Sequence, residues 1–441
     1  MRAHLGGCRR IARLAGLLLL LVPAAGLPEE VLTLEQALRE ARTANARLPL
    51  PAFELDIARQ KSREARAERW FKVALDGGLI YAPPGSYDPA LTNLGEERFL
   101  VVARQPVFDG GARSAAVASA EAGVEAAGAR YRIAEKDLDL EVRARFNELC
   151  QARAEGKIRR EGIEHLNAYE SLLRSRQASG QGVAADVLKT QVRLAAEEAD
   201  ALESDRRADE ARIALNELMG RDPAGALAVE ELAAPEAPAG GGGETWTAAP
   251  DIAEAEAQIR SADANLALAR SEAKLHLFVA FDFGFWGSDT TQWIPDSMRA
   301  SDPDATFPDR VRRDAGYSLS LGFSLPLWDF GAIRARVAQA QFSLDEARQR
   351  LEVERRQTRL RWEQAAAALP NLYRQIEILA GAVPVAWDSY LQTESRYRGG
   401  SATTLEVLDA QSAAVDARVR LADAILRYHI AQAVALRWGT P

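Results

Sequence analysis

The strongest constraint in this sequence is an internal duplication. The motif PVFDGGA, which begins at Pro106, returns as PLWDFGA at Pro326, an offset of 220 residues (326 minus 106). The segment 175–191 returns at 395–411 with the same offset, and VALDGGLI from Val73 resembles VAFDFGFW from Val279. A repeat of this length indicates one structural unit used twice. We therefore expect tandem repeats at 27–220 and 251–441.

Both repeats predict the same order of elements: a helix, two strands, a very long helix and a return helix. In the first repeat, the strands are expected at about 73–81 and 98–108 and the two long helices at about 112–177 and 183–219. In the second repeat, they are expected at about 277–286 and 316–328, then 332–398 and 403–438. The shorter helices before the strands are expected at 34–69 and 251–274.

The long helices carry heptad patterns. Val117, Val124, Tyr131 and Leu138 are spaced seven apart, as are Val337, Leu344 and Leu351 in the second repeat. Such spacing is typical of helices that pack along a coiled-coil seam. Glycines at 180, 182, 399 and 400 then break each pattern and predict a helical hairpin. Between the repeats, 221–250 is expected to be a linker or equatorial segment, and its run Gly240–Gly243 favours a flexible linker.

The strands alternate strictly between large apolar and small or polar residues. In the fourth, Tyr317, Leu319, Leu321 and Phe323 share one face, and serines and a glycine share the other. Ten alternating residues can cross an outer-membrane-type bilayer when the strand is tilted. A soluble sheet packed on a core is the alternative, but the heptad helices are already committed to one another. Four strands cannot close a barrel, so a spanning sheet requires several copies of the chain.

The N-terminal residues 1–26 are expected to be a signal peptide, with Arg9, Arg10 and Arg13 before a short apolar core. Cys8 would leave with this segment, so Cys150 would be the only cysteine, and a disulfide within the chain is excluded.

The composition excludes several function classes. A net charge of −8 and a pI near 5.4 argue against nucleic acid as a partner. His165, His276 and His429 are scattered without ligand spacing, so no metal site, cofactor or catalytic constellation is predicted.

Several motifs together resemble the outer membrane efflux protein family, the TolC-like exit ducts. They are LTLEQALREARTANARL from Leu32, the junctions QPVFDGGARSAAV and LPLWDFGAIRARV, the turns GQGVAADVL and GSATTLEVLDAQ, and the repeat ends LMGRDP and LRWGTP. The resemblance implies an α+β membrane protein of two repeats, each a β-hairpin plus a long α-helical hairpin. It implies a homotrimer with a 12-stranded β-barrel continued by a periplasmic α-helical barrel. Such a protein would be a passive channel in the outer membrane of a Gram-negative-type cell, the exit duct of a tripartite efflux or type I secretion system.

The resemblance also implies partners and sites. The partners would be outer-membrane lipid, a periplasmic adaptor and an inner-membrane pump or ABC exporter. Four candidates for pore constriction and gating are Asp186 and Tyr397, as a polar link, and the acids Glu406 and Asp409. Candidate adaptor contacts are the tip residues Gly180, Gly182, Val183, Gly399, Gly400 and Thr403. The strand-to-helix junctions are Pro106, Asp109 and Gly111, then Pro326, Asp329 and Gly331.

Alternatives to these site interpretations are open. Acids near a helix start are favoured on any exposed surface, and glycines reverse a chain without binding anything. The chain also departs from the family pattern at Ala46, where proline is usual, and at Ala402, where some members carry a basic latch residue. For the whole protein, the rival hypothesis is a periplasmic coiled-coil adaptor without a channel. An exported enzyme would lack a site in this sequence.

Overall fold

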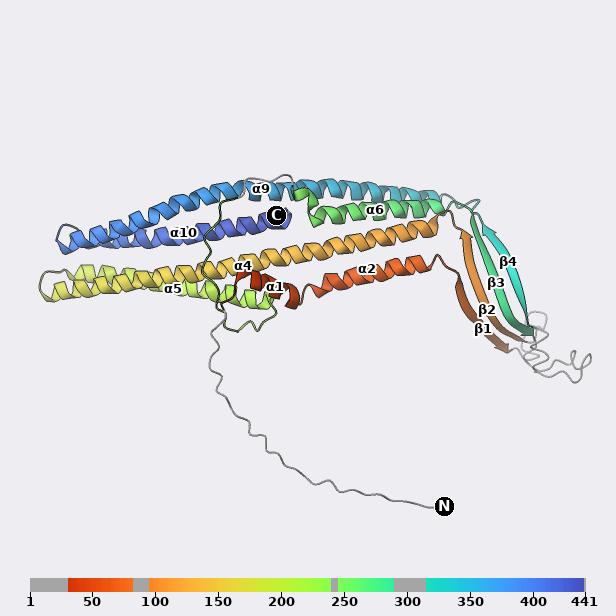
Figure 1. Cartoon of the computed structure of the whole chain (residues 1–441), viewed down its shortest axis with the longest axis horizontal. Coiled ribbons are helices and arrows are strands. Elements are labelled where there is room, and N and C mark those ends of the chain that lie inside the picture. Colours follow the sequence, from red (N-terminus) through yellow and green to blue (C-terminus); the bar gives the residue numbers. More distant parts are fainter. Residues whose placement is uncertain (1–30, 82–94, 239–244, 289–314, 440–441) are drawn as a thin grey trace, which may run out of the picture.

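The computed structural model describes residues 31–81, 95–238, 245–288 and 315–439. The protein is an elongated bundle of helices with a four-stranded sheet at one end (Figure 1). The predicted signal peptide and the run Gly240–Gly243 lie outside the described residues. None of the helices in the described part of the chain is long and apolar enough to cross a membrane.

The sheet consists of β1 (Lys72–Tyr81), β2 (Gly95–Phe108), β3 (His276–Ser288) and β4 (Ala315–Ser324), antiparallel and in that order. Pairing of β2 with β3 joins the two repeats. Residues opposite each other share a face, and one such row is Leu75, Val101, Phe283 and Tyr317. All four side chains in this row are exposed, so most of the apolar face predicted from the alternation has no cover within the described chain, although Phe285 is buried.

The strand register corrects one expectation about the duplication. Lys72 pairs with Arg104 and His276 pairs with Ser324. Since Arg104 and Ser324 are equivalent at an offset of 220, Lys72 is equivalent to His276, an offset of 204 (276 minus 72). The sequence match of Val73 to Val279 is therefore two residues out of register. A two-residue slip keeps every side chain on its own face, so the alternation could not reveal it.

Strand β4 ends at Ser324, although a strand was predicted to Trp328. In the first repeat, the equivalent residues 105–108 pair with β3 alone, because β1 begins opposite Arg104. Residues 325–328 have no such neighbour, since β4 lies at the edge of the sheet. The backbone pattern of a strand is present there, but the pairing partner is not.

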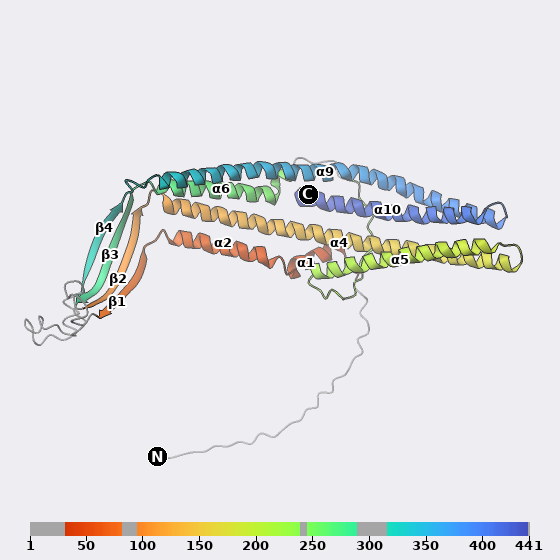
Figure 2. The ribbon, with the colours of Figure 1, turned by 180° about the vertical axis from the view of Figure 1, so that it is seen from behind.

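Four helices lie side by side next to the sheet, in the order α2 (Pro49–Ala67), α4 (Ala112–Ala178), α6 (Pro250–Ser271) and α9 (Ala332–Arg398). Away from the sheet, α4 forms a hairpin with α5 (Ala184–Leu218), and α9 forms one with α10 (Thr404–Trp438) (Figure 2). Of the predicted heptad residues, Val117, Leu138, Leu344 and Leu351 are buried, and Val124, Tyr131 and Val337 are half-buried.

The helix expected at 34–69 is two helices, α1 (Leu34–Ala44) and α2. The extended backbone of Asn45 ends α1, and Pro49 stands in the first turn of α2, where a missing N–H costs nothing. The side-chain amide of Asn45 donates to the Leu218 carbonyl (2.9 Å), which ties this break to the end of α5.

Residues 221–238, the described part of the segment between the repeats, pack against the middle of the helical bundle. Leu32 forms a parallel bridge with Val229. Leu227 is buried in the core of α1, α4 and α5. Farther along, the Tyr428 hydroxyl of α10 donates to the Glu236 carbonyl (2.6 Å). The short helix η1 (Thr245–Ala248) leads from this segment into α6.

Candidate functional site at the hairpin tips

The two hairpin turns have the same backbone geometry. Gly180 and Gly400 both have left-handed φ angles, 76° and 77°. In the first turn, the Gln181 N–H donates to the Arg176 carbonyl (2.9 Å), and the Ser401 N–H donates to the Arg396 carbonyl (2.9 Å) in the second. These six-to-one hydrogen bonds are those of a Schellman motif, which closes a helix at a left-handed residue. The duplication thus extends to individual backbone hydrogen bonds.

The starts of the return helices differ. Thr403 and Glu406 form a capping box, in which the Thr403 N–H donates to the Glu406 carboxylate (2.6 Å) and the Glu406 N–H donates to the Thr403 hydroxyl (3.3 Å). Hydrogen bonds from the Thr403 backbone and hydroxyl lower the pKa of Glu406. Val183, at the same position in the first hairpin, has no side-chain cap. Glu406 therefore stabilises its own helix, and Asp409 is exposed close by.

Tyr397 is only 8% exposed and lies between the two hairpins. Its ring meets that of Tyr169 edge to face, with centroids 5.3 Å apart. Within the described part of the protomer, no hydrogen bond joins Tyr397 to Asp186, the polar link that the resemblance implied. The Asp186 backbone instead accepts from the Thr190 hydroxyl (3.0 Å). Burial raises the pKa of Tyr169, with a smaller contribution from the negative charge of Asp186.

Arg176 is a tip residue that the sequence reasoning missed. Its guanidinium lies 4.8 Å from the Tyr397 ring centroid and donates to the carbonyls of Tyr397 (3.3 Å) and Arg398 (2.9 Å). It therefore joins the end of α4 to the negative C-terminal end of α9. Arg396, its copy in the second repeat, donates to Ser401 in its own turn (3.2 Å). Both repeats carry an arginine at this position, but the packing of the hairpins determines which arginine contacts the other hairpin.

A buried ionic cluster lies between α4 and α5 and was also not foreseen. Glu197 is 2% exposed and accepts from Arg159 (3.2 Å) and Arg193 (2.8 Å). Glu155, also buried, accepts from Arg159 (3.0 Å) and Arg207 (2.8 Å). Charged residues on a long helix are also typical of a solvent-exposed face, so the sequence did not distinguish a buried ionic cluster from a solvated surface.

At the other end of the bundle, the two strand-to-helix junctions share one hydrogen-bond pattern. Asp109 accepts from the N–H groups of Gly111 (3.0 Å) and Arg113 (3.1 Å). Asp329 accepts from those of Gly331 (2.9 Å) and Ile333 (2.6 Å). Both aspartates thus cap their helices as expected. Burial opposes ionisation of Asp109, but the Arg113 hydrogen bonds outweigh it and lower its pKa.

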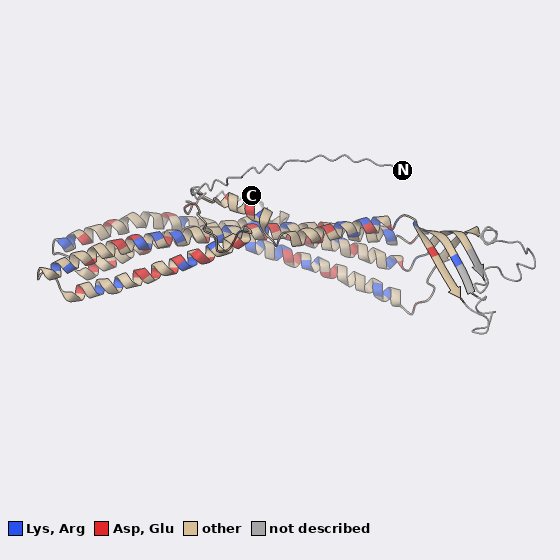
Figure 3. Cartoon of the chain, turned by 90° about the horizontal axis from the view of Figure 1, so that it is seen from below, with Lys and Arg blue, Asp and Glu red and all other residues tan. Residues whose placement is uncertain are grey.

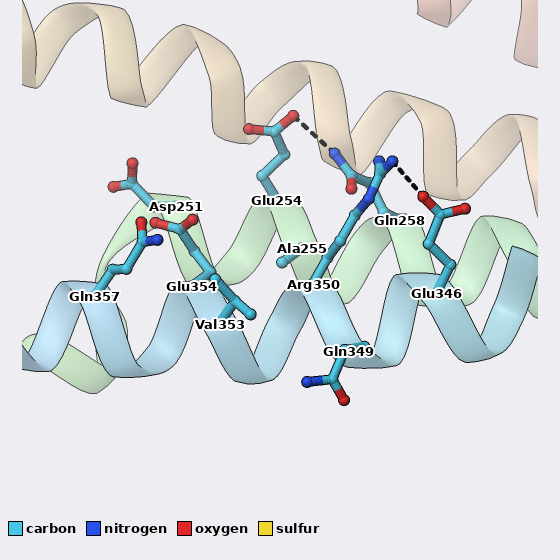
Figure 4. A pocket seen from close by; sticks show the side chains of 10 residues that line it. All are labelled: Asp251, Glu254, Ala255, Gln258, Glu346, Gln349, Arg350, Val353, Glu354 and Gln357. Atoms are coloured by element: carbon cyan, nitrogen blue, oxygen red, sulfur yellow. Dashed lines mark hydrogen bonds and ion pairs between the residues drawn. The ribbon is translucent and has the colours of Figure 1, made fainter.

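A groove between α6 and α9 is lined mainly by charged and polar side chains (Figure 4). Its acids are paired: Glu254 accepts from Gln258 (3.0 Å) and Glu346 from Arg350 (2.6 Å). Asp251 accepts from Arg437 (2.8 Å). Among the residues described, no group of His, Cys, Asp and Glu is arranged to hold a metal ion. Charges of both signs continue along the bundle, whereas the strands carry few (Figure 3).

Comparisons with known proteins agree with this architecture. Residues 29–221 and 244–437 match the family described as outer membrane efflux protein. The chain is 28% identical over 307 residues to the pyoverdine export outer membrane protein OpmQ of Pseudomonas aeruginosa. This match covers 67% of the chain and 60% of OpmQ, so the chain spans less than two thirds of the relative's length.

Two solved structures have the same fold. The outer-membrane channel OprN matches with a TM-score of 0.78 at 21% identity, over 92% of this chain and 89% of OprN. CusC matches with a TM-score of 0.80 at 17% identity, over 92% of both chains. The fold class, the outer-membrane location with a periplasmic helical extension and the expectation that the chain is not an enzyme all agree with the matched family. The two matched segments correspond to the two repeats, and the chain belongs to the outer membrane efflux protein family.

Proposed function

We propose that this protein is the passive exit duct of a tripartite export system. The observation that carries the proposal is the sheet of membrane-length strands whose apolar face is exposed, next to a helical bundle far too long for a membrane. Water-exposed apolar area of this kind is unstable unless lipid covers it. Duct function also needs no nucleotide or catalytic site, in keeping with the lack of such motifs in the sequence.

The assembly that we propose is a homotrimer. The four-stranded sheet ends in β1 and β4, which are open edges. Open edges are not tolerated in lipid, because their N–H and C=O groups would lack partners. Three copies would close a 12-stranded barrel, within the range of known membrane barrels. The helical hairpins would continue it into the periplasm, where a periplasmic adaptor and an inner-membrane pump or ABC exporter would bind near the tips.

Conductance of the purified protein in planar bilayers tests the channel. We expect trimers in detergent and discrete conductance steps, and monomers without conductance would contradict the proposal. The rival adaptor hypothesis predicts release from outer-membrane fractions by high salt, whereas a barrel stays. The exposed sheet disfavours the adaptor. The name of OpmQ makes pyoverdine the first cargo to test.

The candidate pore acids have their own test. If Glu406 and Asp409 face the lumen of the trimer, Glu406→Gln with Asp409→Asn should lower the preference for cations over anions. Reversal potentials in a salt gradient measure this preference. Because Glu406 also caps α10, the single variant Asp409→Asn separates charge from cap loss. An unchanged reversal potential in both variants would place the acids outside the pore.

A further inference from the structure

Phe330 has the only left-handed backbone among the non-glycine residues in the described ranges, with φ of 54°. This conformation is unfavourable for a residue with a Cβ atom. The side chain is also 93% exposed. Its equivalent in the first repeat is Gly110, with φ of 64°, which is buried. The same junction is thus covered in one repeat and bare in the other.

The cover over Gly110 comes from the repeat that follows it. Lys274, in the link between α6 and β3, donates from Nζ to the Gly110 carbonyl (2.8 Å). A Cβ atom on Gly110 would lie 2.7 Å from the Lys274 Cβ, so no side chain fits there. The junction of one repeat is therefore sealed by the helix-to-strand link of the next.

In the proposed trimer, the repeat beside the second repeat is the first repeat of the neighbouring copy. By the offset of 204, the equivalent of Lys274 is Trp70 (274 minus 204), which is 72% exposed. Trp70 follows α2, at one end of the row of helices, and Phe330 precedes α9, at the other end. Trp328 stacks edge to face on Phe330, with centroids 5.8 Å apart, and is also exposed.

We propose that Phe330 packs against the partner subunit's Trp70, as an aromatic lock between neighbouring subunits. This inference rests on the trimer proposed above and names the contact that holds it. Within a protomer, Lys274 hydrogen-bonds to Gly110. At the equivalent place between subunits, the lock is an apolar contact between two large rings. Because Gly110 has no room for a Cβ atom, the subunits must stand farther apart at this point than the two repeats within one protomer.

The same equivalence gives the strand register between subunits. Within the protomer, Arg104 of β2 pairs with Ala280 of β3. The residue equivalent to Arg104 in the second repeat is Ser324 (offset 220), and the residue equivalent to Ala280 in the first repeat is Asp76 (offset 204). If the same pairing is repeated between subunits, Ser324 pairs with the partner subunit's Asp76. This register places Leu321 opposite the partner's Leu79, on the apolar face of both strands. Residues 325–328 then acquire the partner that they lack in the single chain.

Cysteine cross-linking tests the lock, and the equivalence of the two repeats determines which residue pairs are replaced. Cys150 is buried, and in a Cys150→Ala background Phe330→Cys with Trp70→Cys should give covalent dimers and trimers with a short thiol cross-linker. The control pair, Phe330→Cys with Leu50→Cys, places the second thiol at the far end of α2 and should not link. For the register, Leu321→Cys with Leu79→Cys should link more efficiently than Leu321→Cys with Ile80→Cys, whose side chains face opposite ways.

The outcomes separate this inference from the proposed function. A conducting trimer in which only the control pairs link would overturn the lock and keep the duct. A conducting trimer in which the thiol of the Phe330→Cys variant reacts only with a lipid-dissolved maleimide would assign Phe330 to lipid and also overturn the lock. Absence of any trimer would refute both.

Heat dissociation of the trimer gives a second measurement that needs no cysteine. Phe330→Ala and Trp70→Ala should each lower the temperature at which the trimer dissociates, and the double variant should lower it no further than the more damaging single one. Fully additive shifts would show that the two rings do not meet.

Discussion

Removal of the Arg176 side chain should loosen the contact between the two hairpin tips. The side chain makes two hydrogen bonds to carbonyls at the end of α9 and a cation–π contact with Tyr397. At a half-exposed site, about 1 kcal/mol for each hydrogen bond and about 0.5 kcal/mol for the ring contact are reasonable. Arg176→Ala should therefore cost roughly 2.5 kcal/mol, which is about a 70-fold change in an equilibrium.

The assay is the open probability of single channels in planar bilayers. If the contact between the two hairpins keeps the tip closed, Arg176→Ala should raise the ratio of open to closed time by up to about 70-fold. Arg396→Ala is the matched control, because this copy donates to the Ser401 carbonyl of its own turn, and it should change the ratio far less. Equal effects of the two variants, or none from Arg176→Ala, would refute the reasoning that the cross-hairpin contact matters.

Three further predictions concern stability and reactivity. Glu197→Ala leaves Arg159 and Arg193 with fewer partners, so the free energy of unfolding measured in urea titrations should fall by about 2–4 kcal/mol. The exposed control Glu203→Ala should lower it by about 0.5 kcal/mol or less, and similar losses in both variants would contradict this prediction. The lowered pKa of Asp109 means that its stabilising contribution is present above its ordinary pKa of 3.8 and is lost as the pH falls through the lower folded value. Amide exchange should show this loss at the first junction, and Asp109→Asn should remove the pH dependence; a pH dependence that persists would assign it elsewhere. Burial raises the pKa of the Cys150 thiol to about 12, so alkylation at pH 8 should be blocked in the folded protein and rapid in denaturant, and fast labelling of the native protein would show that the site opens.

Much of the architecture could be read from local pattern. Heptads and period-two alternation are properties of neighbouring residues, so the long helices and the membrane-length strands were visible without coordinates. The helix-capping role of Asp109 and Asp329 was equally local, since the N–H groups they accept from lie within four residues. The fold class implied by the resemblance agrees with the matched family.

Other features depend on which distant segments meet. The sequence predicted a linker or equatorial segment at 221–250 but could not show which residues it contacts: Leu227 is buried, and the Glu236 carbonyl accepts from Tyr428. The two-residue shift between Val73 and Val279 was invisible because alternation repeats every two residues. The pore assignments of Asp186, Tyr397, Glu406 and Asp409 are predictions that a single protomer does not test.

The sequence by itself determined that one unit is used twice, that its strands have one apolar face and that its helices pair along seams. These properties follow from spacing along the chain, which survives without any knowledge of neighbours. Only the tertiary structure decided that Arg176 crosses between hairpins while Arg396 does not, and that Gly110 is covered while Phe330 is bare. The two copies are alike in sequence, but one has a following repeat beside it and the other lies at the edge of the protomer. Contact between such edges is a property of the three-dimensional arrangement, and no periodicity encodes it.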